Sequence, residues 1–94
     1  MGSREEYIEK MKNQLDEWNR DIDALEDKIA TATGPAREEL RQRLDKTRKS
    51  FDGGRAKLSE IQASGEESWK KLRDEAEHIW DTLKHSINYF RSQL

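Results

Sequence analysis

Two histidines and an aspartate near the C-terminal end have the types and spacing that come closest to a metal site. His78 and His85 are seven positions apart, so they lie on one face of a helix, and Asp81 lies between them. Imidazole and carboxylate groups bind zinc, but zinc sites need several convergent ligands with supporting hydrogen bonds. Because the sequence offers few further ligands, we interpret both histidines as exposed polar residues and predict no metal or other cofactor.

A basic stretch in the middle of the chain has side chains that could bind the phosphates of a nucleic acid. Its members are Arg41, Arg43, Lys46, Arg48, Lys49, Arg55 and Lys57. Asp45, Asp52 and Glu60 interrupt it, and Phe51 is its one aromatic residue. The whole chain has a net charge of −2. We therefore predict that these cations border a partner helix, and that the protein does not bind nucleic acid.

No residues have the spacing of a catalytic set. The sequence contains no glycine-rich phosphate loop, no nucleophile spaced for activation by a base, and no cysteine. Ser50, Ser59 and Ser68 have the positions of ordinary residues on a helix surface. The sequence therefore predicts a protein that is not an enzyme.

The elements that must position these residues are three helices, which the spacing of apolar residues predicts. From residue 8 onward, apolar residues recur in alternating steps of three and four, the heptad pattern of a coiled coil. They are Ile8, Met11, Leu15, Trp18, Ile22, Leu25, Ile29 and Ala32. Ser3 and Glu6 have the spacing of a capping box that opens this first helix, over about residues 4–33.

The second predicted helix covers about residues 35–63 and has two weak positions, Thr47 and Gly54, in its apolar seam. The seam consists of Leu40, Leu44, Thr47, Phe51, Gly54, Leu58 and Ile61. Gly53 and Gly54 together cost a helix about 2 kcal/mol relative to two alanines. Either the helix bends at this pair, or a large side chain needs the space beside it.

The third predicted helix covers about residues 65–92, and Ser64 with Glu67 has the spacing of a second capping box. Its seam consists of Trp69, Leu72, Ala76, Ile79, Leu83, Ile87, Phe90 and Leu94. Trp80 and Tyr89 lie off this seam. We therefore predict that the third helix has apolar groups available for a second contact.

A glycine–proline pair indicates where the first two helices separate. Gly34 permits the backbone of a tight reversal, and Pro35 is tolerated at the start of a helix. Residues 1–33 carry five basic and nine acidic side chains, whereas residues 34–64 carry eight basic and five acidic ones. Opposite charges of this kind favour the pairing of the two helices.

The register of the three seams agrees with two reversals, near residues 34 and 64. Trp18 then falls level with Phe51 and about one turn from Trp80. The same reversals align Ile8 with Ile61 and Trp69, and Ile29 with Leu40 and Phe90. We predict a single all-α domain over residues 1–94, either an antiparallel coiled-coil helical hairpin or an up-down-up three-helix bundle.

The composition predicts that this domain associates with itself. Of 94 residues, 32% are hydrophobic and 40% are charged, so one chain has a small core. We predict a homo-oligomer with a structural or interaction role. The predicted packing and interface residues are Ile8, Leu15, Trp18, Ile22, Leu44, Phe51, Leu58, Trp69, Leu72, Ile79, Trp80 and Leu83. In a structural alternative, the third helix leaves the hairpin of the first two and swaps into a partner chain.

The second function hypothesis is a protein that binds membrane surfaces through its third helix. Trp69, Trp80, Tyr89 and Phe90 would enter the lipid interface. The polar face of this helix is mixed in sign, which weakens the hypothesis, and an aromatic stripe at helical spacing is more often core. The chain also has no apolar run of about 18 residues that would span a bilayer.

Two long segments, SREEYIEKMKNQLDEWNRDIDALEDK and ASGEESWKKLRDEAEHIWDTLK, resemble a group of short bacterial coiled-coil proteins. The specific parts are Glu5-Glu6-Tyr7, the run from Leu15 to Asn19, and Ala63-Ser64-Gly65 with Trp69 following. Most members of this group are uncharacterised, and some are described as stress-response proteins. The resemblance implies a bacterial, cytoplasmic, non-enzymatic protein and implies no catalytic or ligand residues.

Overall fold

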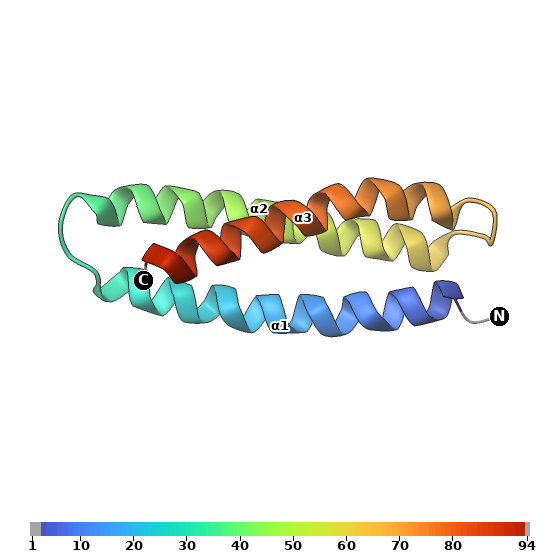
Figure 1. Ribbon diagram of the computed structural model, residues 1–94, viewed down its shortest axis with the longest axis horizontal. Helices are drawn as coiled ribbons and strands as arrows, with labels where there is room; N and C mark the ends of the chain where they lie inside the picture. The colour runs from blue at the N-terminus through green and yellow to red at the C-terminus, as the bar shows by residue number, and fades with distance from the viewer. Residues whose placement is uncertain (1–2, 94) are drawn as a thin grey trace.

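The computed structural model describes residues 3–93, which form three α-helices joined by two reversals (Figure 1). α1 spans Ser3–Thr31, α2 spans Ala36–Ala63 and α3 spans Trp69–Gln93. α2 runs antiparallel to both other helices, and the bundle measures 51 × 18 × 18 Å. The predicted all-α, up-down-up three-helix bundle is confirmed. Leu94, the last position of the predicted third seam, lies outside the described residues.

The first reversal lies at the glycine–proline pair. After α1 ends, the Ala32 backbone N–H donates to the Ile29 carbonyl over 3.2 Å. Gly34 has φ +95°, in the left-handed region where glycine avoids the steric penalty of other residues. Pro35 has φ −63°, the angle that its ring imposes, and α2 begins at the next residue. The pair therefore stops one helix and starts the next.

The second reversal corrects the prediction that Ser64 opens the third helix. Ser64 instead closes α2, because its hydroxyl donates to the Ile61 carbonyl over 2.7 Å and its backbone N–H donates to the same oxygen over 3.2 Å. The carbonyls of a last helical turn lack intrahelical partners, and Ser64 satisfies one of them. α3 begins later than predicted, at Trp69, whose backbone N–H donates to the Gly65 carbonyl over 3.2 Å.

One hydrophobic core runs along the bundle and takes side chains from all three helices. Ile22, Ile61 and Leu83 are 0% exposed. Among the twelve predicted packing residues, the structure buries Leu15, Trp18, Ile22, Leu44, Phe51, Leu58, Trp69, Trp80 and Leu83. It leaves Ile8, Leu72 and Ile79 half-buried against the same core. The predicted seams thus face the interior of a single chain.

The glycine pair of α2 has a packing role at one of its two positions. α2 continues through Gly53 and Gly54, so the helix does not break there. A Cβ atom on Gly54 would lie 2.7 Å from Cζ3 of Trp80, whereas a Cβ atom on Gly53 would meet nothing within 4 Å. The Trp80 ring also lies against Trp18, with ring centroids 6.2 Å apart. Trp80 is 5% exposed, so its ring packs within the bundle and is not available for a second contact.

Candidate functional site

The three residues of the candidate metal site do not form one. Within residues 3–93, no three histidine, aspartate or glutamate side chains lie close enough together to hold a metal ion. His78, Asp81 and His85 are all exposed on α3. The one polar contact in this region joins the Thr82 hydroxyl to the His78 carbonyl over 2.9 Å and belongs to the helix itself.

Several residues of the basic stretch border neighbouring helices. Arg48 forms ion pairs with Asp23 and Glu26 of α1, the first at 3.1 Å. Lys57 forms an ion pair with Glu75 of α3 at 3.0 Å, and the hydrogen bond between them raises the pKa of Lys57. These contacts join α2 to both other helices, as expected of cations that border a partner helix.

Other members of the stretch stay free of such pairing. Arg41, Lys46 and Lys49 are exposed, and none of the ion pairs within residues 3–93 includes them. Arg55 lies over the ring of Phe51, 6.0 Å from its centroid. The bundle therefore leaves an excess of positive charge on α2.

The aromatic residues of the membrane hypothesis face the core. Trp69, Trp80 and Phe90 are 3%, 5% and 1% exposed. Tyr89 is half-buried, and the guanidinium of Arg43 covers its ring at 4.3 Å from the centroid. None of the three helices, over the part of the chain that the structure describes, is long and apolar enough to cross a membrane.

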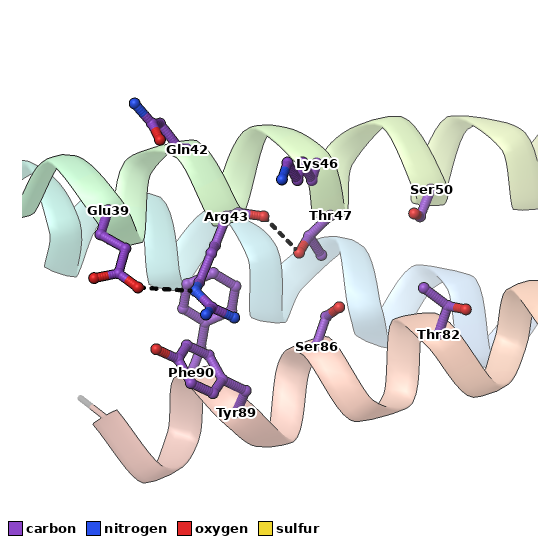
Figure 2. Close-up of a pocket in the computed structure, with 10 residues that line it drawn as sticks. All are labelled: Glu39, Gln42, Arg43, Lys46, Thr47, Ser50, Thr82, Ser86, Tyr89 and Phe90. Carbon is purple, nitrogen blue, oxygen red and sulfur yellow. Dashed lines mark hydrogen bonds and ion pairs between the residues drawn. The ribbon is translucent and has the colours of Figure 1, made fainter.

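A hollow of about 600 Å³ between α2 and α3 is the candidate functional site, and we call it the α2–α3 groove (Figure 2). Its lining consists of Glu39, Gln42, Arg43, Lys46, Thr47, Ser50, Thr82, Ser86, Tyr89 and Phe90. Figure 2 shows the Ser50 side chain on α2 and the Ser86 side chain on α3 projecting into the gap between the helices. The volume lies in the range of ordinary ligand pockets, but the walls are more polar.

Short side chains on the facing sides of α2 and α3 leave the space of the α2–α3 groove. Gly54 lets the two helices approach where Trp80 packs. Toward the C-terminal end of α3, Arg43 lies over the Tyr89 ring, while Ser50 and Ser86 are too short to fill the space between the helices. Phe90, which is 1% exposed, forms the apolar floor.

The charge of the groove is predominantly positive. Arg43 lies between the Tyr89 ring and Glu39, whose carboxylate is 3.5 Å from its Nε. Lys46 adds a second cation, and Glu39 is the only acidic residue of the lining. The Thr47 hydroxyl is already used, because it donates to the Arg43 carbonyl over 2.9 Å. With Arg43 engaged by Glu39 and Tyr89, the groove offers Lys46 and the hydroxyls of Ser50 and Ser86, an arrangement that favours acidic groups.

A polar cluster that the sequence did not predict joins α1 to α3. The indole N–H of Trp80 donates to the hydroxyl oxygen of Tyr7 over 2.6 Å. The Tyr7 hydroxyl in turn donates to Oε1 of Glu77 over 3.2 Å, and its ring lies 6.0 Å from that of Trp69. Burial raises the pKa of Tyr7 to about 12. The only signal in the sequence is that Tyr7 adjoins Ile8, the first apolar residue of the heptads.

Arg4 connects the start of α1 to the end of α2. Its guanidinium donates to the Ser64 carbonyl and, over 3.5 Å, to the Ile61 carbonyl. These carbonyls end α2, so a cation beside them complements the negative end of the helix dipole. The contact fixes the second reversal against α1. Together with the Tyr7 cluster, it closes one end of the bundle.

The most specific feature of the geometry of residues 3–93 is the positive α2–α3 groove. No protein-family model, curated protein or solved structure matches the chain. The resemblance to short bacterial coiled-coil proteins therefore stays a prediction.

Proposed function

We propose that this chain is a non-enzymatic helical interaction protein that associates with copies of itself through charged faces of the intact bundle. The observation that carries the proposal is an excess of opposite charge on two sides of the molecule. α1 presents carboxylates to solvent, and the α2–α3 groove presents cations on the other side of the bundle. A molecule with two such faces is complementary to itself.

The acidic face lies on the outer side of α1. We define it by the exposed carboxylates of Glu5, Glu6, Glu9, Asp16, Glu17 and Asp27. None of the ion pairs found in residues 3–93 uses these six carboxylates. Lys10, Lys12, Arg20 and Lys28 are exposed on the same helix, and the six carboxylates outnumber these four cations. The face therefore keeps a net charge of −2 over these ten side chains.

The aromatic residues of α3, which the sequence predicted as part of an interface, are buried within one chain. Trp69, Trp80 and Leu83 pack inside the bundle, so an interface through them requires α3 to leave its own chain. Exchange of α3 between two chains would recreate the same apolar contacts. The charged faces need no such opening, and we therefore prefer them.

Other parts of the proposal rest on the sequence. The absence of a catalytic role follows from the lack of a nucleophile–base pair or phosphate loop in the sequence. A cytoplasmic, stress-related role follows from the family resemblance alone and stays a prediction. Binding to a membrane surface would require α3 to turn its buried aromatic residues outward.

Light scattering at two salt concentrations tests the proposal. One chain has a mass of 11.1 kDa. We expect the weight-average mass to exceed this value at about 10 mM salt and to fall toward it at about 1 M, where the Debye length is about 3 Å. Exchange of α3 would instead give a dimer that salt does not dissociate. A mass of 11.1 kDa at every protein and salt concentration would contradict the proposal.

A further inference from the structure

We propose that the α2–α3 groove receives the acidic face of α1 from a second copy of this chain. The inference rests on the proposed function and names the two surfaces that meet. It follows from the shape of the groove, its charge, and the positions of the two faces on the bundle.

The shape of the groove suits the surface of a helix. Two antiparallel helices form its walls, and the short side chains of Thr47, Ser50, Thr82 and Ser86 line it. Side chains of a packed helix insert as ridges into such grooves, with helix axes about 8–10 Å apart. An inserted helix would complete a four-helix arrangement at this side of the bundle.

The charge of the groove selects an acidic helix. Arg43 and Lys46 lie on the α2 wall, and Glu39, which pairs with Arg43, lies at one end. Asp16 and Glu17 lie near the middle of α1, in the acidic face. Contact between these two surfaces would place carboxylates beside Lys46, which lacks an acidic partner among the described residues.

The positions of the two faces determine the kind of assembly. In a three-helix bundle, the groove between two helices lies on the side away from the third helix. The acidic face and the groove therefore lie on different sides, and each copy that donates α1 keeps its own groove free. A contact of this head-to-tail kind extends to further copies unless its rotation closes a ring. We expect the mass to rise beyond that of a dimer as the protein concentration increases.

Charge reversal at Lys46 tests the groove, with Lys70 as the matched control. Both lysines are exposed and lie outside the ion pairs of residues 3–93, and Lys70 is remote from the groove lining. We expect Lys46→Glu to weaken association at low salt about fivefold, and Lys70→Glu to weaken it less than about twofold. Lys46→Gln should give an intermediate value. Circular dichroism checks that each variant remains helical.

The double variant Asp16→Lys with Glu17→Lys tests the acidic face of α1. It should weaken association as Lys46→Glu does, and a mixture of the two variants should recover it, because the altered charges are then complementary. Association of the wild type that neither variant weakens would overturn the groove and leave self-association standing. A wild type that stays monomeric would overturn both proposals. Loss of association in both variants without recovery in the mixture would overturn the head-to-tail pairing.

Discussion

At position 54, the absence of a side chain decides how closely α2 and α3 approach. A Cβ atom there would lie 2.7 Å from Trp80 and 3.3 Å from Ile79, so the indole ring occupies the space that alanine would fill. The indole also needs its acceptor on Tyr7, 2.6 Å away. Gly54 and Tyr7 thus fix Trp80 from two sides, one by shape and one by hydrogen bonding.

Alanine at the two adjacent glycines should have opposite effects. Gly54→Ala gains helix propensity but overpacks Trp80, and we expect a net loss of about 1 kcal/mol in the free energy of unfolding. Gly53→Ala meets open space and should gain about 0.5–1 kcal/mol. Urea denaturation of both variants measures the difference. Equal stabilisation by the two substitutions would contradict the packing of Trp80 against Gly54.

Removal of the Tyr7 hydroxyl should destabilise the bundle and change its response to alkaline pH. Tyr7→Phe leaves the Trp80 indole N–H without its acceptor, at a cost of about 1–2 kcal/mol. The pKa of Tyr7 is raised from 10.0 to about 12, so the folded state favours the protonated hydroxyl. The stability that the protonated Tyr7 hydroxyl contributes is complete below pH 10 and is lost as the pH rises from 10 to 12.

The difference in unfolding free energy between wild type and Tyr7→Phe isolates this effect from other titrating groups. The difference should shrink between pH 10 and pH 12. Tyr89→Phe is the control, because the hydroxyl of Tyr89 forms no hydrogen bond with the described residues. A difference that does not change with pH would argue against a buried, hydrogen-bonded Tyr7.

At the scale of the helices, Ser64 shows why the ends of a helix are harder to predict than the helix itself. A serine hydroxyl can accept from the backbone of a following helix or donate to the last carbonyls of a preceding one. The Ser-x-x-Glu spacing indicates the first case, but the hydroxyl bonds to Ile61 of α2. The next helix begins only at Trp69, which is 3% exposed.

Two alanine substitutions distinguish these roles of Ser64. Ser64→Ala should cost about 0.5–1 kcal/mol, because the Ile61 carbonyl loses a partner. Glu67→Ala should change stability by less than about 0.5 kcal/mol, since an exposed residue outside both helices is replaced. Thermal unfolding measures both. A cost of about 1 kcal/mol for Glu67→Ala would instead support a capping box formed by Ser64 and Glu67.

The sequence predicted the helices and their buried faces because both follow from a local period. The steps of three and four place Leu15, Trp18 and Ile22 on one stripe whatever lies opposite. Trp80 differs, because it adjoins Ile79 and either residue could face inward. The choice depends on Gly54 and Tyr7, which lie on other helices. The α2–α3 groove likewise depends on side chains from two helices, and neither helix alone reveals it.

At the scale of the whole molecule, the bundle satisfies its apolar residues within one chain. The large apolar side chains of residues 3–93 are buried or half-buried, and the ion pairs of Arg48, Lys57 and Arg91 join all three helices. The Arg91 pair reaches Asp21 of α1 over 2.9 Å. We therefore propose that each chain folds without a partner and that association uses surfaces that are already formed.

Mass and helicity followed together through a dilution series test this central claim most directly. Light scattering gives the mass, and circular dichroism on the same samples gives the helix content. We predict that the mass falls toward 11.1 kDa on dilution while the helix content stays constant, because each chain folds on its own. Helix content that falls in parallel with mass would contradict the account, since folding and assembly would then be a single event.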